Sequence, residues 1–171
     1  VNDPFSKHRI GVVAYSSDEV LQSKDIIVEA QYKVSPILDA DTDNIINDGF
    51  WEDYTGQWGH FTLYYAFDND ETTAAYTMEA GDSVIGKYIG YDFEKDVEVA
   101  RVAGKIRMRG YIIQYSDDCV NWSDAVTGTS NSSSSGDNFD NKIDTNVGKH
   151  RYWRLYIQNG CSVYNWGAGV Y

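Results

Sequence analysis

The sequence has little cysteine and no long apolar run. Its two cysteines, Cys119 and Cys161, are too few in 171 residues for a disulfide framework. We expect two ordinary thiols, with a single bridge as the alternative if their two loops meet. No stretch approaches the roughly 20 apolar residues that span a bilayer, and the first residues, VNDPFSKHRIG, lack the apolar core of a secretory signal. Membrane insertion is therefore not expected.

Basic residues are also scarce. Lysine and arginine number 14 against 26 aspartates and glutamates, which gives a formal net charge of −12. Such a surface repels phosphate backbones and anionic lipid. Nucleic acid is therefore excluded as an expected partner, and phospholipid binding, which favours a basic rim, fits poorly.

The chain holds none of the common catalytic motifs. G-x-S-x-G, the Walker loop, H-E-x-x-H and C-x-x-C are all absent. The histidines His8, His60 and His150 stand in unrelated settings, and none has the spacing from a nucleophile that a triad suggests. The many acidic residues leave a paired-carboxylate glycosidase open by composition, but such enzymes are normally larger. We expect a protein that is not an enzyme.

The sequence does contain the alternation typical of β-strands. Residues 111–115 (YIIQY) alternate between two faces with a period of two. The polar residues that follow, 116–121, carry side chains that hydrogen-bond nearby backbone, and they predict a hairpin turn. Trp122 ends the motif, and we expect it to be a buried core residue beside Tyr115 or Tyr111.

Further strands are predicted on both sides of this hairpin. Residues 83–115 contain two strands joined by a turn at residues 94–96, and residues 151–156 alternate again before a closing strand. The apolar clusters RIGVVAY and DIIVEAQY, within residues 9–35, predict an N-terminal strand pair. We expect residues 1–171 to form a single all-β domain, in which residues 1–35 are a strand extension added to the sandwich or docked on a partner.

Four segments, taken in order, are similar to one known family. They are AFDNDETT (66–73), IGYDFEKDVEV (89–99), the strand followed by SDDC and NW (111–122), and HRYWRLYI (150–157). Their order resembles the discoidin family, also called coagulation factor V/VIII type C domains, and the related galactose-binding-like carbohydrate-binding modules, over roughly residues 60–171. Asn69 and Cys119 stand where that pattern usually has glycine. The resemblance implies a jelly-roll β-sandwich with a galactose-binding-domain-like fold.

The resemblance also implies a structural calcium ion that holds one loop together. By resemblance its ligands are Asp68, Asp70 and Thr73, and oxygen-only ligation suits a hard cation. The family's closing strand usually adds a glutamate, but this chain has Gly167 near that position. An Asx-type turn that needs no metal is the alternative. A second acidic run, residues 39–43, has the aspartate spacing of a calcium loop but lacks the glycine and the bidentate glutamate that such a loop needs.

Aromatic side chains gather in two stretches that are also rich in polar residues and glycine. Sugar recognition needs a flat ring to stack on a pyranose and short polar groups to bond its hydroxyls. We therefore expect a carbohydrate-binding surface at one end of the sandwich, formed by Trp51, Tyr54, Trp58 and His60 together with Tyr164, Asn165 and Trp166. The three tryptophans among them are expected to be at least partly exposed. The alternative for the first stretch is a loop pinned to the sandwich by its tryptophans.

Glycan binding is the function that these features favour. We expect a non-catalytic adhesion module that recognises cell-surface or extracellular carbohydrate and is itself extracellular or on a particle surface. The alternative is a structural subunit of a larger assembly, such as a virion decoration, baseplate or tail-adhesin protein, in which the same fold docks onto other subunits.

Overall fold

The computed structural model describes residues 9–15, 20–27, 42–57, 59–68, 70–131, 135–162 and 167–171, the first two stretches by their backbone. The chain divides into two compact units, Val1–Tyr32 and Lys33–Tyr171. In the first unit, β1 (Arg9–Tyr15) and β2 (Val20–Ile27) form an antiparallel hairpin. The predicted N-terminal strand pair is confirmed, and β2 begins ahead of the apolar cluster that predicted it.

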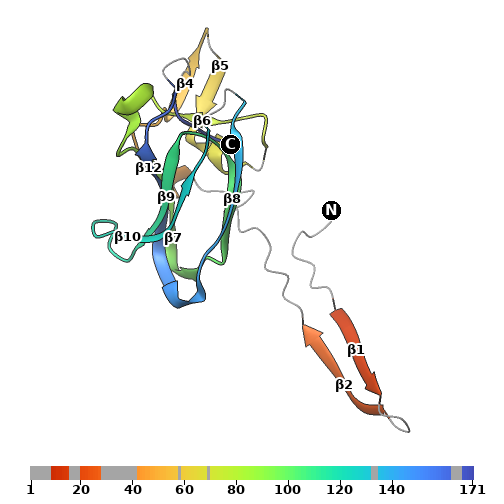
Figure 1. Ribbon diagram of the computed structural model, residues 1–171. Helices are drawn as coiled ribbons and strands as arrows, with labels where there is room; N and C mark the ends of the chain where they lie inside the picture. Colours follow the sequence, from red (N-terminus) through yellow and green to blue (C-terminus); the bar gives the residue numbers. More distant parts are fainter. Residues whose placement is uncertain are drawn as a thin grey trace. The chain divides into compact units, whose positions relative to one another are not determined.

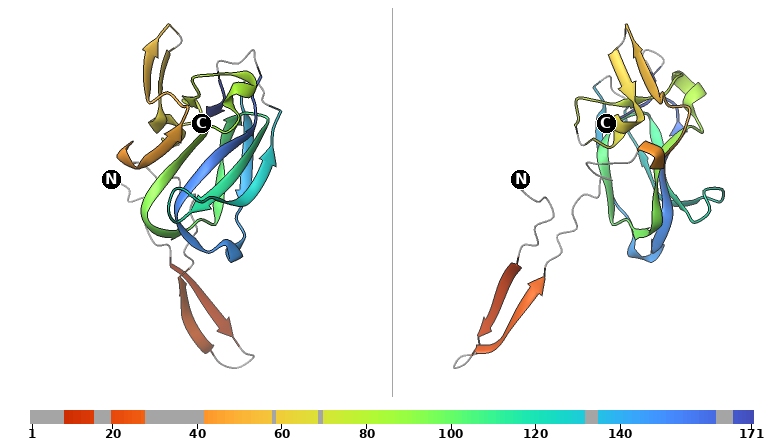
Figure 2. Two further views of the ribbon diagram at one scale, coloured as in Figure 1. Left: turned by 90° about the vertical axis from the view of Figure 1, so that its left-hand side faces the viewer. Right: turned by 180° about the vertical axis from the view of Figure 1, so that it is seen from behind.

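The second unit is a sandwich of two antiparallel sheets (Figure 1, Figure 2). The five-stranded sheet has the order β10-β9-β12-β7-β3, and the four-stranded sheet has the order β11-β8-β13-β6. Their strands are β3 (Ile45–Asp48), β6 (Ala75–Tyr76), β7 (Tyr88–Glu98), β8 (Arg101–Arg107), β9 (Gly110–Ser116), β10 (Ser123–Thr129), β11 (Asp137–Lys142), β12 (Lys149–Asn159) and β13 (Gly169–Val170). A separate hairpin joins β4 (Asp53–Gly56) to β5 (Gly59–Thr62). The predicted all-β, jelly-roll β-sandwich is confirmed.

Helical structure in the described residues is limited to four short 3-10 segments. They are η1 (Thr42–Asn44), η2 (Leu63–Ala66), η3 (Gly81–Val84) and η4 (Thr145–Val147). The Thr62 hydroxyl caps η2 by accepting a hydrogen bond from the Tyr64 amide at 3.0 Å. Within the described part of the chain, no helix has the length and apolar character needed to cross a membrane.

The core lies between the two sheets. Ile113 stands opposite Leu155, and Tyr111 stands opposite Ile157, and all four side chains are buried. Ile106 of β8, which is fully buried, joins the same cluster from the four-stranded sheet. Full burial of an aliphatic side chain of this size contributes about 1.5–3 kcal/mol. The alternation predicted for β9 and β12 therefore places one face of each strand in the core.

The predicted turn at residues 94–96 is wrong. β7 continues through these residues, and its register with β12 shifts between His150 and Tyr152, so that they bulge out of the ladder. Glu94 has a φ of +59°, and its amide donates a hydrogen bond to the Asp92 carboxylate at 2.7 Å. A bulge exposes charged side chains as a turn does, but it leaves the strand unbroken. The chain turns only at the end of β7.

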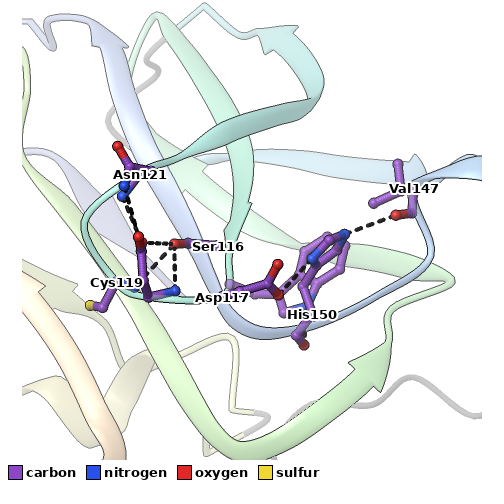
Figure 3. Close-up of polar contacts among 8 residues, drawn as sticks. Ser116, Asp117, Cys119, Asn121, Val147 and His150 are labelled. Carbon is purple, nitrogen blue, oxygen red and sulfur yellow. Dashed lines mark hydrogen bonds and ion pairs between the residues drawn. The ribbon is translucent and has the colours of Figure 1, made fainter.

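The turn between β9 and β10 is closed by polar side chains (Figure 3). The Asp118 carboxylate accepts hydrogen bonds from the amides of Val120 (2.9 Å) and Asn121 (2.7 Å), and the Ser116 hydroxyl accepts one from the amide of Cys119 (3.0 Å). Cys119 has a φ of +60°, in the left-handed region that favours glycine. The predicted hairpin is confirmed, and its strained position is the one where the family pattern has glycine.

The two cysteines are both free thiols, as expected. Cys119 is half-buried in the β9–β10 turn, and Cys161 is buried after the end of β12. Burial raises the pKa of each thiol above its ordinary value. Both cysteines are therefore mainly neutral at physiological pH.

The prediction that Trp122 is a core residue is wrong. Its indole is half-buried on the outer face of the five-stranded sheet, where the guanidinium carbon of Arg154 lies 3.8 Å from the ring centroid. The core position beside Tyr115 belongs to Trp153, whose ring centroid is 5.6 Å from that of Tyr115. Trp122 follows the turn and precedes β10, so strand alternation does not assign it to a face.

Replacing Trp122 by alanine is expected to cost about 0.5–2 kcal/mol, the range of a cation–π contact. Ile157→Ala, at a fully buried position, is expected to cost about 2–5 kcal/mol because it leaves a cavity. Urea unfolding of both variants beside the parent chain measures the two losses. If both variants lost the same unfolding free energy, Trp122 would have to be treated as a core residue.

The hydrogen bonds of Asp118 are expected to make stability depend on pH. The amide of Asn121 is the largest cause that lowers the pKa of this carboxyl well below its ordinary value. A pKa that is lower in the folded state stabilises the fold above the unfolded-state pKa of about 3.9, and this contribution is lost as the pH falls below it. Asp118→Asn should therefore be less stable than the parent chain at pH 7, and the gap should shrink between about pH 5 and pH 3. Thermal melts across this range test it, and a constant gap would contradict it.

Candidate functional site

The β4–β5 hairpin projects from one end of the sandwich (Figure 1). Tyr54 pairs with Phe61 and Thr55 pairs with His60 across it. Gly59 takes a φ of +115° where the chain enters β5, a conformation that side chains disfavour. The stretch that the sequence predicted as a loop is thus a two-stranded ribbon, whose pairing fixes which side chains lie side by side.

His60 is the centre of a polar cluster of three side chains. Its Nε2 lies 2.9 Å from the Asp53 carboxylate, and its Nδ1 lies 3.0 Å from the hydroxyl of Tyr65 in η2. In the neutral ring, Nε2–H donates to Asp53 and Nδ1 accepts from Tyr65. The His60 and Asp53 side chains are 49% and 76% exposed, so the second carboxylate oxygen and the ring edge face solvent. The cluster offers oriented hydrogen-bonding groups to a ligand that carries hydroxyls.

A row of aromatic rings runs from this hairpin to the four-stranded sheet. The ring centroids of Trp51 and Tyr54 are 4.9 Å apart, and Tyr54 stacks on Phe61 at 5.7 Å. Phe61 meets Tyr76 of β6 edge to face at 4.8 Å, and the Tyr76 hydroxyl hydrogen-bonds that of Tyr171 at 2.7 Å. Trp51 and Tyr54 are half-buried, so each has part of its ring covered and part facing solvent. This is the geometry of a stacking surface held by its own neighbours.

Of the predicted carbohydrate-binding residues, Trp51 and Tyr54 are in ring contact, and His60 lies on the paired strand with its side chain on the other face of the ribbon from Tyr54. Trp58 and the second stretch, residues 164–166, lie outside the described residues, so their part in the site stays a prediction. Phe50, in the same aromatic stretch, is fully buried and bridges to Thr77, so it belongs to the core.

Sequence reasoning missed Asp53 and Tyr65. Both reach His60 only through folding, Asp53 across the β4–β5 pairing and Tyr65 from the helical turn that follows β5. One signal was available, because glycines at 56 and 59 flank a two-residue segment between two runs that hold aromatic and threonine residues. Treating that pattern as a hairpin places Asp53 near His60.

The second polar cluster involves His150 at the β9–β10 turn (Figure 3). Its Nδ1 lies 2.8 Å from the Asp117 carboxylate, its Nε2 lies 2.8 Å from the Val147 carbonyl, and its ring stacks on Tyr115 at 4.1 Å. These contacts tie η4 to the turn. Neither hydrogen-bond partner is a nucleophile, so the cluster is not a catalytic triad.

The residues assigned to calcium by resemblance share one loop. The Asp68 carboxylate accepts hydrogen bonds from the Asp70 amide (2.9 Å) and the Thr73 hydroxyl (2.6 Å), and Asp70 accepts from the amide and hydroxyl of Thr72. The bonds to Thr72 lower the pKa of Asp70. These are Asx-type turns that use the loop's own donors. Among the described residues no group of three or more metal-ligating side chains forms, so calcium stays a prediction.

A separate cavity of about 480 Å³ opens between the two sheets. Its lining is mainly apolar and includes Phe67, Phe93 and Phe139. None of the hairpin residues lines it. An apolar interior suits a hydroxyl-rich ligand less well than the polar cluster around His60 does.

Comparison with known proteins gives structural likeness alone. No protein-family model matches the chain, and no curated protein matches it. A chitosan-binding module from a chitosanase/glucanase of Paenibacillus sp. IK-5 has a similar structure. The match covers 74% of this chain and 92% of that module, with a TM-score of 0.53 and 22% sequence identity. The module CBM32-5 of Clostridium perfringens, in complex with GalNAc-β-1,3-galactose, is similar to 75% of this chain over 93% of its own, with a TM-score of 0.53 and 16% identity.

A third solved structure is the family 32 carbohydrate-binding module of Clostridium perfringens NanJ, in complex with galactose. It covers 74% of this chain and 88% of its own, with a TM-score of 0.51 and 13% identity. This chain has the fold of these modules. The likeness confirms the β-sandwich that the resemblance implied, and at such identities it carries no ligand over to this chain.

The calcium prediction can be tested on the loop of Asp68. If the ion binds there, calcium chloride raises the melting temperature of the chelator-treated protein, because a ligand that binds only the folded state stabilises it, by about 2.7 kcal/mol at a hundredfold excess over Kd. Asp68→Asn removes a charged ligand and should abolish the rise. An identical melting temperature with calcium and with chelator would leave the Asx turns as the whole closure of the loop.

Proposed function

We propose that this protein is a non-catalytic glycan-binding module that recognises cell-surface or extracellular carbohydrate through the β4–β5 hairpin. One observation carries the proposal. The exposed cluster of Asp53, His60 and Tyr65 lies on the same hairpin and adjoining turn as the half-buried rings of Trp51 and Tyr54.

The chemistry of this pair of features suits a sugar. The apolar C–H face of a pyranose stacks on a flat ring, and its hydroxyls need short, oriented donors and acceptors beside that ring. Tyr54 supplies a ring on one face of the ribbon, and Asp53 supplies acceptors on the other face, where His60 and Tyr65 hold its carboxylate in place. A glycan that crosses the edge of the ribbon meets both. A net charge of −12 favours a ligand that is neutral or of low charge density over a polyanion.

The solved structures that share this fold support the proposal. Two of them hold GalNAc-β-1,3-galactose and galactose, and a third is a chitosan-binding module. An extracellular or particle-surface location, and membership of the discoidin-like family, belong to the same proposal. The alternative, a structural subunit of a virion or other assembly, stays a prediction.

Tyr54→Ala and His60→Ala are expected to weaken glycan binding by about 1–3 kcal/mol each, as loss of a binding hot spot does. A glycan-array screen identifies the ligand, and calorimetry measures the affinity of each variant. Glu98→Ala, which changes an exposed residue at the end of β7, serves as the control and should bind like the parent chain. Melting temperatures should stay close to that of the parent chain.

Two outcomes would contradict this proposal. The first is a screen in which no carbohydrate binds the folded protein. The second is a loss of stability in Tyr54→Ala as large as that of Ile157→Ala, because the ring would then be a core element and not a ligand platform.

A further inference from the structure

The outer face of the five-stranded sheet carries a cation enclosed by aromatic rings. The guanidinium carbon of Arg154, on β12, lies 3.8 Å from the ring centroid of Trp122, 4.5 Å from that of Tyr88 and 5.3 Å from that of Tyr156. All three rings are half-buried, as is Arg154 itself. The site is distinct from the β4–β5 hairpin, because it shares no residue with the cluster around His60.

Arg154 differs from four other cations of the chain in having no carboxylate partner among the described residues. Arg101, Arg109, Arg151 and Lys87 each form an ion pair with an aspartate. Within the described part of the chain, no carboxylate lies at ion-pair distance from Arg154. In a chain with 26 acidic residues, the half-buried guanidinium of Arg154 thus has no counter-ion among the described residues.

The hydrogen bonds around Arg154 leave part of its donor fork open. Its Nε donates to the Gln114 side chain at 2.8 Å, the one hydrogen bond that Arg154 makes to a described residue. Gln114 in turn donates to the Asp124 carboxylate at 2.7 Å. The Asp124 carboxylate is therefore linked to Arg154 through one side chain, and no described residue accepts a hydrogen bond from the two terminal nitrogens of Arg154.

Two features show that the surroundings of Arg154 are partly apolar and closely packed at its base. Burial lowers the pKa of its guanidinium, which reports the loss of water around the charge. Opposite it on β7 stands Gly90, where a Cβ would lie 2.6 Å from the Cβ of Arg154 and 2.3 Å from the Trp153 carbonyl oxygen. No larger residue fits there without a shift of backbone, so β7 and β12 pack closely where Arg154 leaves the strand.

We propose that Arg154 with Tyr88, Trp122 and Tyr156 forms a second carbohydrate subsite, which binds the carboxylate of a uronic acid residue. A guanidinium presents two parallel N–H donors that match the two oxygens of a carboxylate. The flanking rings pack against the C–H groups of the sugar that carries it. The inference rests on the proposed function in one respect, that the ligand is a carbohydrate.

A single carboxylate is the anion that fits this site. The net charge of −12 repels a dense polyanion, and dissolved salt screens this repulsion beyond about 10 Å at ordinary ionic strength, so a single carboxylate is repelled far less than a polyanion that lies along the surface. At contact distance the open N–H donors of Arg154 dominate. A uronic acid residue in an otherwise neutral glycan meets both conditions.

Nuclear magnetic resonance of the ¹⁵N-labelled full chain tests the subsite with free galacturonic acid and glucuronic acid as probes. Galactose and glucose are the neutral counterparts, and acetate is the carboxylate without a sugar. We expect a uronic acid to shift the Nε–H signal of Arg154 and the indole N–H signal of Trp122, and acetate and the neutral sugars to shift them far less.

Arg154→Gln should weaken uronic acid binding about tenfold or more, because a hydrogen-bonded charge pair is lost. Arg101→Gln, which removes the same charge from the opposite sheet, is the matched control and should change the affinity less than about twofold. Arg154→Lys keeps the charge but lacks the paired N–H donors, and its affinity for a uronic acid should lie between those of Arg154→Gln and Arg101→Gln. It also serves if Arg154→Gln does not fold.

Several results would overturn this inference. They are an absence of shifts at Arg154 and Trp122 with either uronic acid, equal shifts with acetate, and undiminished binding by Arg154→Gln. His60→Ala separates this subsite from the hairpin site. Uronic acid shifts that persist in that variant show that the Arg154 subsite does not depend on the hairpin. In the parent chain, the same shifts with no glycan bound at the hairpin would refute the proposed hairpin site and leave the Arg154 subsite standing. Hairpin binding without these shifts would do the reverse.

Discussion

The alternation of side chains along β12 divides the sandwich into an inside and an outside. β12 lies between β7 and β9, and its residues Trp153, Leu155 and Ile157 are buried between the sheets. Arg154 and Tyr156, which alternate with them, stand on the outer face beside Trp122. A register shift of one residue would exchange the two sets. The core and the outer aromatic cluster therefore depend on the same backbone hydrogen bonds.

The elements that could be predicted from the sequence are those that local chemistry decides. The β9–β10 hairpin is such a case, because strict alternation up to Tyr115 meets an aspartate, Asp118, that can bond the amides of the turn. The bulge in β7 is the opposite case. Glu94 and its charged neighbours have the composition of a turn, and only the pairing with β12 shows that the strand continues. The prediction for Trp122 was wrong for a related reason, because strand alternation assigns no face to a residue between a turn and a strand.

The candidate site divides along the same line. Trp51, Tyr54 and His60 could be identified from composition, because aromatic residues interleaved with glycine and charge have few core positions to occupy. Asp53 and Tyr65 could not, because they reach His60 through the pairing of two four-residue strands and through a helical turn. Strands so short show hardly any periodicity. Contacts made across a ribbon are a property of register, and register is weakly encoded in so few residues.

The aromatic row gives the hairpin its place on the sandwich. β4 and β5 pair with each other and with no other described strand, and an isolated two-stranded ribbon is marginal in water. What attaches this ribbon to the sandwich is the contact of Phe61 with Tyr76, the hydrogen bond of Tyr76 to Tyr171, and the amide of Trp51 bonded to the Tyr76 carbonyl. Tyr54 stands on the solvent side of that attachment. Rings at the base of the row therefore position the ribbon, and under the proposed function the half-buried ring of Tyr54 is the one that meets the ligand. One residue type would then serve folding at one end of the row and recognition at the other.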